Sequence, residues 1–301
     1  MPELPEVETV RRGLAGFILG AKLERVEVLC DKSFIGKPVM GRVKDIRRFG
    51  EALVIDLDND FSMMIHLRMT GQLIYDGEER YAAGHPSENF VAELPNKQTR
   101  VVLEFEKGTL YFNDQRKFGF IKVMPIAKVE EDTFIRKLAK EPWRMTGEEL
   151  HAQLQRHKKA PVKAVILDQT VMSGLGNIYA DEALFAAKIH PARKAGDLSL
   201  AEAKKLLIAA REVMEKGIES GGSTIRNYVK ADGTRGDYLD LFAKVYHRDG
   251  KPCDRCGEEI KKIKVAGRGT HFCPKCQTCG KLVENSEVDG VKKLQKTEEK
   301  A

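Results

Sequence analysis

The segment CDRCGEEIKKIKVAGRGTHFCPKC (residues 253–276) decides how the last part of this 301-residue chain folds. Its cysteines follow the spacing C-x2-C-x16-C-x2-C, which lets two thiolate pairs converge on one tetrahedral ion. Four thiolates leave no open coordination position, so the spacing predicts one structural zinc that folds the module. The predicted ligands are Cys253, Cys256, Cys273 and Cys276.

Two other arrangements of these thiols compete with that zinc site. A pair of disulfides would also link the cysteines, but disulfides fit poorly with a chain that shows no secretory signal. Cys279 extends the second pair to CxxCxxC, so an exchange of ligands is conceivable, and we treat Cys279 as a spare thiol.

Charge is concentrated around the same segment. The whole chain carries 51 Lys+Arg against 45 Asp+Glu, a net +6 that says little about partners. Between Lys244 and Cys276, nine Lys/Arg stand against four Asp/Glu, so a net +5 lies in this module. Residues 261–273 alternate around a Gly267/Gly269 turn, which predicts a small β-hairpin. A basic hairpin of this kind favours binding to a polyanion.

Upstream of the zinc module, apolar residues recur at helical spacing from about residue 130 to 220. Residues 221–236 are rich in Gly, Thr and Asp and are predicted to form a loop. The predicted helical stretches are DTFIRKLAKE (132–141), GEELHAQLQRH (147–157), KAVILDQ (163–169), IYADEALFAAKI (178–189) and SLAEAKKLLIAAREVMEKGIE (199–219).

The first part of the chain combines one helix with many short strands. Apolar residues at helical spacing predict a helix over 5–18, and residues 22–124 consist of short β-rich runs separated by Gly, Asp and Asn turns. We expect an antiparallel β-sandwich or barrel there. The clearest runs are LERVEVL (23–29), ALVIDL (52–57), MMIHL (63–67), RVVLEF (100–105) and TLYFND (109–114).

These patterns predict an α+β multidomain protein. The expected divisions are 1–128 for an N-terminal helix with a sandwich, 129–236 for a helical domain with a loop, 237–277 for the zinc hairpin, and 278–301 for a disordered tail. No apolar run approaches the roughly 18 to 20 residues that span a bilayer. The N-terminus lacks a targeting signal, so we expect a cytoplasmic protein with no membrane partner.

The start of the chain, Met-Pro-Glu, carries an unusual chemical option. Initiator methionine is removed before small residues such as proline, which would leave Pro2 as a free secondary amine followed at once by Glu3. A free α-amine has a pKa of about 8, so part of it is unprotonated and nucleophilic at neutral pH. Attack of a secondary amine on an aldehydic carbon gives a cationic iminium, which is a strong electron sink. By itself, this tripeptide is usually only a permissive N-terminus.

Five motifs occur together and in a fixed order: MPELPEVETVRRGL (1–14), HLRMTGQL (66–73), NDQRKFGF (113–120), SGLGNIYADEALF (173–185) and GRGTHFCPKC (267–276). The set resembles the formamidopyrimidine-DNA glycosylases, a bacterial repair family that removes oxidised purines such as 8-oxoguanine. The likeness covers residues 2–276. The related endonuclease VIII branch is similar at Pro-Glu and in the helical domain, whereas the PELPEVE start and the loop from Gly221 favour the first branch.

The resemblance implies how catalysis would work. Pro2 would attack C1′ of the damaged nucleotide, and Glu3 would act as general acid while the sugar ring opens. The iminium would then allow β- and δ-elimination, which cut the strand on both sides. Glu6 fits a supporting carboxylate, and its alternative is a solvent-facing acid in the first helical turn. Arg268 matches the zinc-finger arginine that contacts phosphate near the lesion.

The resemblance also implies which residues grip damaged double-stranded DNA, in a protein expected to be a nucleoid-associated monomer. Met69, Arg116 and Phe118 match the trio that fills the gap left by an extruded base. Taken alone, Met69 and Phe118 would be strand core residues. The helical domain would contain a helix-two-turn-helix, and a loop with Thr224, Arg226 and Tyr228 would close over the base. The remaining predicted DNA contacts are His66, Lys159, Lys163 and Asn177; the alternative for the lysines is a solvated surface charge.

Two positions depart from the family pattern. Glu51 in RRFGEALVIDL stands where the family has the lysine implicated in elimination, and Gln98 stands where the family often has histidine. Glu51 is either natural, compensated by nearby basic residues (Lys44, Arg47 or Arg48), or an introduced substitution that weakens turnover. It motivates a rival function, a lesion- or abasic-site-binding protein with impaired catalysis. A plain zinc-finger duplex binder is a third possibility, and it leaves Pro2-Glu3 unexplained.

Overall fold

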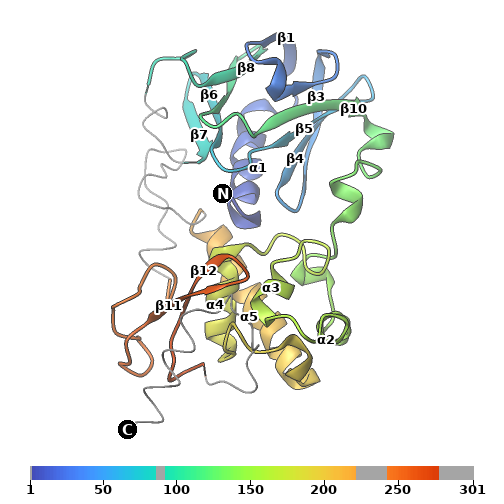
Figure 1. The fold of residues 1–301 in the computed structure, drawn as a ribbon. Coiled ribbons are helices and arrows are strands. Elements are labelled where there is room, and N and C mark those ends of the chain that lie inside the picture. Colours follow the sequence, from blue (N-terminus) through green and yellow to red (C-terminus); the bar gives the residue numbers. More distant parts are fainter. Residues whose placement is uncertain (1, 86–91, 222–242, 278–301) are drawn as a thin grey trace. The chain divides into compact units, whose positions relative to one another are not determined.

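The computed structural model describes residues 2–85, 92–221 and 243–277 (Figure 1). These residues fall into two compact units. The first contains the described part of 1–137 with residues 217–221, and the second contains 138–216 and 243–277. The predicted base-capping loop with Thr224, Arg226 and Tyr228, and the predicted tail from 278, lie outside the described residues. No helix in the described part of the chain has both the length and the apolar character needed to cross a membrane.

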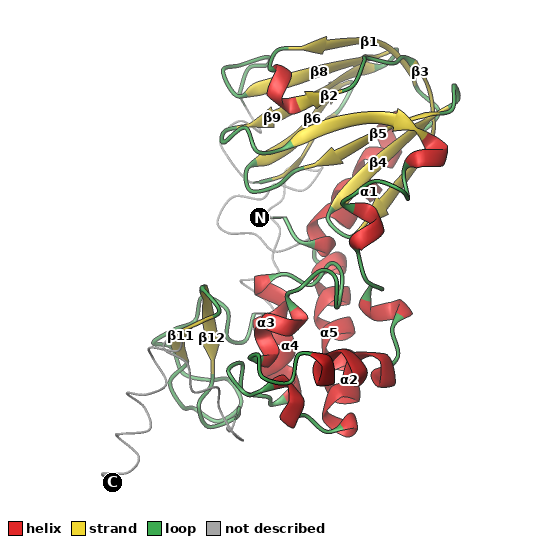
Figure 2. Cartoon of the chain, turned by 45° about the vertical axis from the view of Figure 1, so that its right-hand side comes forward, coloured by secondary structure: helices red, strands yellow, loops and turns green. Residues whose placement is uncertain are grey.

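The first unit is a β-sandwich with helix α1 (Leu4–Ile18) packed against it (Figure 2). Its strands follow the order β2-β10-β5-β4-β3-β1-β8-β9-β6-β7, and the pairing of β1 with β3 joins the two layers. The strands are β1 (Lys22–Val28), β2 (Phe34–Ile35), β3 (Gly41–Phe49), β4 (Ala52–Leu57), β5 (Phe61–His66), β6 (Gly71–Gly77), β7 (Arg80–Gly84), β8 (Thr99–Phe105), β9 (Gly108–Asp114) and β10 (Phe120–Pro125).

Helix α1 is held by the apolar stripe that its sequence predicts. Val7, Val10 and Leu14 recur every three or four residues, are buried, and join a core cluster with side chains of both sandwich layers. Gly13 allows the helix to approach strand β7 closely, because a Cβ at this position would lie 2.2 Å from the ring of Tyr81. This packing fixes the position of helix α1 on the sandwich, and it fixes the position of the N-terminus as well.

The structure confirms the predicted sandwich and corrects two details. The β2–β10 pair is parallel, so the sheet is not antiparallel throughout. Residues 132–141, predicted to be helical, form only one short 3-10 turn at Ile135–Lys137. The side chain of Asp132 accepts the backbone N–H of Phe134 and the ammonium of Lys122, and these local bonds replace helix bonds. The other 3-10 turns are Asp31–Ser33, Ile126–Lys128, Pro142–Arg144 and Ala195–Asp197.

The second unit combines a helical part with the zinc hairpin. Thr146 caps helix α2 by accepting the N–H of Glu149 at 3.2 Å, as the capping-box pattern of this segment requires. The hairpin turn uses Ala266 and Gly267, both at positive φ. The predicted helices from 147 onward and the predicted hairpin are all present. They are α2 (Gly147–Arg156), α3 (Val162–Ile166), α4 (Asn177–Ala187), α5 (Leu200–Glu219), β11 (Lys261–Val265) and β12 (Arg268–Phe272).

Candidate functional site

The N-terminal end of α1 brings the predicted catalytic carboxylates into one buried turn. The backbone N–H of Glu3 donates to Oε2 of Glu6 at 2.7 Å, and Pro5 in the first turn has the fixed φ that a helix start favours. Pro2, Glu3 and Glu6 are all buried. The alternative interpretation of Glu6 as a solvent-facing acid is therefore wrong, because its carboxylate is turned inward to cap the helix.

One helical turn further on, Glu8 gathers three guanidinium groups. Its carboxylate lies 2.8 Å from Nη2 of Arg11 and 2.8 Å from Nε of Arg12, and 3.0 Å from Nε of Arg48 on strand β3. Burial alone raises the pKa of Glu8, but the hydrogen bonds from the three arginines outweigh burial and lower the pKa to about 2. Arg48 also donates to the carbonyl of Gly50 at 3.1 Å. Glu8 thus links helix α1 to the β3–β4 turn.

That turn carries Glu51, the residue predicted to depart from the family pattern. Phe49 pairs with Ala52, which leaves Gly50 and Glu51 as a two-residue turn, and Gly50 takes the positive φ of 55° that such a turn needs. Glu51 is buried, with 6% of its surface exposed. Arg47, one of the predicted compensating residues, pairs with Asp56 at 2.6 Å.

The structure brings Met69, Arg116 and Phe118 together from two separate loops. Nη1 of Arg116 lies 3.2 Å from Sδ of Met69, and its guanidinium carbon lies 5.2 Å from the centre of the Phe118 ring. Met69 is 42% exposed and Phe118 is 56% exposed. The alternative interpretation of both as core residues is therefore wrong. The three side chains form an exposed apolar cluster with one positive charge.

Asp114 holds these two loops in place, and the sequence interpretation missed it. One carboxylate oxygen accepts the hydroxyl of Thr70 and, at 3.1 Å, the N–H of Arg116. The other accepts the N–H of Gly119 at 2.7 Å. Asp114 is fully buried, so its hydrogen bonds are stronger than those of an exposed carboxylate would be. A signal was available, because Asp114 precedes a short polar turn, QRKFG, where acidic side chains commonly accept backbone N–H groups.

His66 lies at the end of β5, where the structure buries it almost completely. Burial, and to a lesser extent the charge of Arg68, lowers the pKa of His66 to about 3. Its Nδ1 accepts the backbone N–H of Arg68 at 3.2 Å. A neutral ring that accepts at Nδ1 carries its proton on Nε2, and Nε2 is buried with no hydrogen-bond partner among the described residues. The predicted contact between His66 and DNA stays a prediction.

The other predicted contact residues lie in the second unit. Lys159 is exposed after helix α2, and Arg268 is exposed as the first residue of β12. Asn177 begins α4, and its amide donates to the carbonyl of Gly269 at 3.2 Å. Lys163 was predicted to contact DNA, and the structure does not support this contact. A direct phosphate contact needs an accessible ammonium, and this side chain is fully buried.

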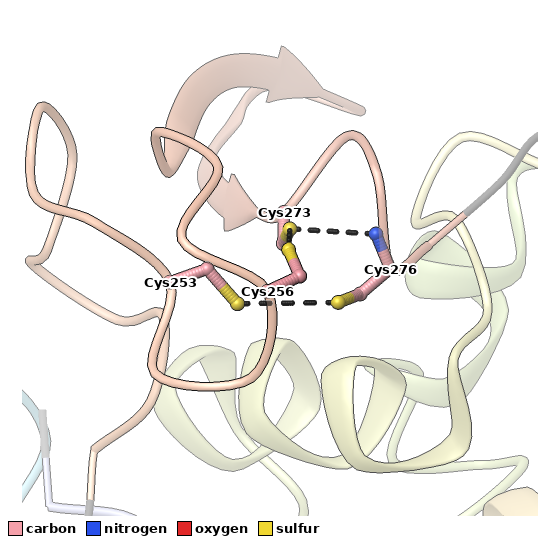
Figure 3. A group of neighbouring side chains, drawn as sticks. All are labelled: Cys253, Cys256, Cys273 and Cys276. Carbon is pink, nitrogen blue, oxygen red and sulfur yellow. Dashed lines mark hydrogen bonds between the residues drawn. The ribbon is translucent and has the colours of Figure 1, made fainter.

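The four cysteines predicted as metal ligands meet at one point of the zinc module (Figure 3). Their sulfur atoms all lie within 4.8 Å of one another, with 4.0 Å between Cys253 and Cys276 and 3.5 Å between Cys256 and Cys273. Zinc–sulfur bonds of about 2.3 Å in a tetrahedron place sulfur atoms about 3.8 Å apart. The donor set and its spacing therefore fit one structural zinc ion, and among the described residues no other group of this kind occurs.

Comparison with known proteins agrees with this geometry. Residues 1–121 match the model of the formamidopyrimidine-DNA glycosylase N-terminal domain, and residues 138–229 match that of the H2TH domain of the same glycosylases. Residues 250–278 match a zinc finger found in FPG and IleRS. A formamidopyrimidine-DNA glycosylase of Pelotomaculum thermopropionicum is 40% identical over 289 residues, which cover 92% of this chain and 99% of the relative.

The chain belongs to the formamidopyrimidine-DNA glycosylase family.

Further members of this family resemble the chain over nearly its whole length. The glycosylase of Streptococcus pyogenes serotype M28 is 42% identical over 293 residues, covering 92% of this chain and 98% of the relative. A structure of the Lactococcus lactis Fpg with DNA that contains an abasic site superposes with a TM-score of 0.80 at 33% identity, covering 92% of this chain and 99% of that one. The crystal structure of MutM (Fpg) from Thermus thermophilus has a TM-score of 0.80 at 36% identity, covering 93% and 100%.

Membership of the formamidopyrimidine-DNA glycosylase family confirms the predicted fold class. The helical part of the second unit corresponds to the H2TH domain, and the hairpin of β11 and β12 belongs to the zinc finger. Cys253, Cys256, Cys273 and Cys276 hold its structural zinc, which would fix the loops and take no part in bond cleavage. The predicted boundaries at 128 and 236 stay predictions.

Proposed function

We propose that this protein is a bifunctional DNA glycosylase and AP lyase that removes oxidised purines, 8-oxoguanine and formamidopyrimidines, from double-stranded DNA. Two observations support the proposal together. The chain belongs to the formamidopyrimidine-DNA glycosylase family, and its second residue is a proline that precedes a buried pair of glutamates at the start of α1. We also propose that it acts as a monomer in the bacterial cytoplasm, at the nucleoid.

The proposed reaction begins at the amine of Pro2, after removal of Met1. The nitrogen lone pair forms a bond to C1′ of the damaged nucleotide while the bond from C1′ to the base breaks, and the proton that the amine loses is taken up by the departing base. Glu3 donates a proton to the ring oxygen as the sugar opens to a cationic iminium. Loss of a C2′ proton then expels the 3′ phosphate, and loss of the C4′ proton in a second elimination expels the 5′ phosphate. Glu6 supports this turn by its bond to the N–H of Glu3.

The proposed DNA contacts use the exposed groups of both units. Met69, Arg116 and Phe118 would fill the space of the extruded base, since their exposed apolar surface gains from stacking between bases. Arg268 and Lys159 would contact phosphates. An amide group has two protons, so Asn177 has one for Gly269 and one for a phosphate oxygen. His66 is the exception among these predicted contacts, because its Nε2, unpartnered within the described part of the chain, is buried and would have to become accessible before it could donate to DNA.

Trapping with borohydride tests the covalent step. The iminium between Pro2 and an abasic or 8-oxoguanine-containing strand would be reduced to a stable adduct, seen as a shifted protein–DNA band. The variant Pro2→Leu should lose the adduct while keeping its affinity for the duplex, because methionine is not removed before a large residue and the free amine then belongs to Met1, one residue away from its place beside Glu3. Pro5→Ala is the matched control, because this proline lies in the same helical turn and has no free amine. A wild-type protein that binds lesion duplex and gives no adduct would refute the lyase proposal.

A second candidate function rests on Glu51. A carboxylate in place of the family lysine removes attraction for a phosphate and adds repulsion, on the order of 1 to 3 kcal/mol when partly buried. The protein would then bind lesions or abasic sites with impaired turnover. The same trapping experiment separates the two functions, because a pure binder shifts lesion duplex and forms no crosslink.

A further inference from the structure

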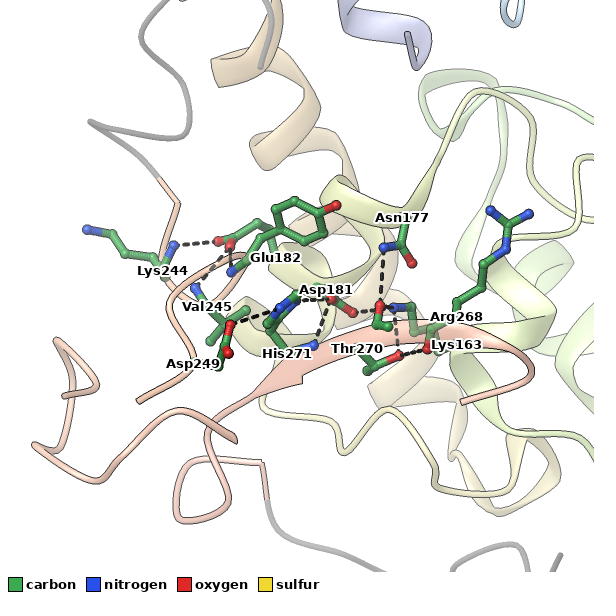
Figure 4. A network of polar contacts seen from close by, with 12 residues as sticks. Lys163, Asn177, Asp181, Glu182, Lys244, Val245, Asp249, Arg268, Thr270 and His271 are labelled. Carbon is green, nitrogen blue, oxygen red and sulfur yellow. Dashed lines mark hydrogen bonds and ion pairs between the residues drawn. The ribbon is translucent and has the colours of Figure 1, made fainter. Parts of the chain in front are cut away.

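A buried ion pair joins two helices of the second unit beneath the zinc hairpin (Figure 4). Nζ of Lys163 on α3 lies 2.7 Å from Oδ1 of Asp181 on α4, and both side chains are completely buried. Charges are retained in such a place only when partners compensate their lost hydration. The pair is therefore a fixed point, and the groups that bond to it are fixed with it.

Two further partners of Lys163 belong to strand β12. Its ammonium donates to Oγ1 of Thr270 at 2.8 Å and to the carbonyl of Gly269 at 3.2 Å. Both residues directly follow Arg268. The lysine thus connects the helical part of the unit to the strand that begins with Arg268. Its ammonium is paired with Asp181 and donates its hydrogen bonds to this strand.

Helix α4 holds the zinc module at two more points. The second carboxylate oxygen of Asp181 accepts the backbone N–H of His271 at 2.8 Å. Glu182, the next residue, accepts the N–H groups of Lys244, Val245 and Tyr246 at 2.8 to 2.9 Å. Two consecutive carboxylates therefore fix both the segment that enters the module and the strand that carries Arg268.

The backbone around Arg268 is anchored on its C-terminal side. The Thr270 hydroxyl donates to the carbonyl of Arg268 at 3.0 Å, and Asn177 donates to the same Gly269 carbonyl that Lys163 reaches. Arg268 itself is exposed. The backbone beside the exposed arginine is thus held by a set of hydrogen bonds, and Lys163, which is buried, donates two of them.

We propose that Lys163 is a positioning residue that aims Arg268 at the DNA backbone, through Gly269 and Thr270, and does not contact DNA itself. The proposal rests on the proposed function insofar as Arg268 is taken to bind phosphate. In this proposal the Lys163–Asp181 pair fixes the position of strand β12 relative to helices α3 and α4.

A double-mutant cycle tests this assignment. Binding of the full-length zinc protein to a duplex with a tetrahydrofuran abasic analogue would be measured for Lys163→Met, Arg268→Ala and the double variant. We expect each single change to weaken binding about tenfold, the usual effect of one lost charged hydrogen bond. In the double variant Lys163→Met should add less than about twofold, because the arginine that it positions is already absent. Lys159→Met, an exposed control, should weaken binding by the same factor with or without Arg268.

A second readout keeps the proposal testable without DNA. Hydrogen exchange of the β12 amides should rise in Lys163→Met and stay unchanged in Arg268→Ala, with one zinc per chain in both. If Lys163→Met does not fold, Lys163→Met/Asp181→Asn removes both charges of the pair and replaces it in both experiments. Independent, multiplying losses in the cycle, or unchanged β12 exchange, would overturn the positioning role. Failure of the wild type to bind any duplex would instead refute the proposed function, and the exchange experiment would still decide this proposal.

Discussion

The substitution Glu8→Gln tests whether the three-arginine cluster stabilises helix α1. Glu8 is buried and its pKa is lowered from 4.5 to about 2 in the folded protein, where hydrogen bonds from Arg11, Arg12 and Arg48 outweigh the effect of burial. Glutamine keeps the size of the side chain and removes its charge. We therefore expect the first unit to lose stability at neutral pH.

The size and pH dependence of the loss follow from the shift. At about 1.36 kcal/mol per pKa unit the full shift corresponds to about 3 kcal/mol, and screening by solvent at Arg12, which is 60% exposed, reduces this to on the order of 2 kcal/mol. Because the folded pKa is the lower one, the stabilisation is fully present above pH 4.5. It is lost as the pH falls from 4.5 toward 2, when the carboxylate takes up a proton in both states.

Calorimetry between about pH 7 and pH 2 would measure this effect. The transition of the first unit should lie about 5 °C lower in Glu8→Gln at pH 7, and the difference should shrink toward zero near pH 2. Glu131→Gln is the matched control, since Glu131 forms an exposed pair with Lys128 and should shift the transition by less than about 1 °C. A shift that is equally large at both ends of the pH range would refute an electrostatic origin.

Three further changes have defined outcomes. Removing zinc with a chelator should abolish DNA binding while the sandwich stays folded, because the thiolate site belongs to the second unit, and anisotropy with far-ultraviolet dichroism would check both. Glu51→Lys should raise strand cleavage more than duplex affinity, as the position belongs to the proposed active site; gel assays of nicking and of binding would show no gain in either if its role is misassigned. Met69→Ala should reduce base excision about tenfold without lowering the unfolding temperature, since the side chain is 42% exposed and packs against little in the free protein. Equal excision by wild type and Met69→Ala in single-turnover kinetics would exclude its role as a wedge.

Much of the fold was predictable because its signals are local. The apolar spacing in α1, α4 and α5 and the strand runs of β4, β8 and β9 depend on neighbours a few residues apart. Residues 132–141 show where this fails. Their helical pattern is overridden by the side chain of Asp132, which bonds to Lys122 and to its own backbone neighbours. Competing side-chain bonds of this kind depend on partners that a periodic pattern does not contain.

For the candidate site, too, some features were predictable from local sequence and others were not. The cysteine spacing predicts a four-thiolate site, and the structure places the four sulfurs together as expected. Met69 and Arg116 are 47 residues apart in sequence, and they are brought into contact by the pairing of β6 with β9, the pairing of β5 with β10 and the carboxylate of Asp114. The sequence could propose that such residues act together only through resemblance to a family.

The amino-acid sequence by itself determined the zinc ligands and most of the helices and strands, because spacing along the chain dictates periodicity and metal geometry. It offered catalytic candidates at the N-terminus only through resemblance to a family. Only the tertiary structure decided which charged side chains face solvent. Lys159 and Lys163 lie in one basic segment, yet the first is exposed and the second is buried against Asp181. The difference arises because a lysine's environment is set by the helix and strand that pack over it, and these come from residues far away in the sequence.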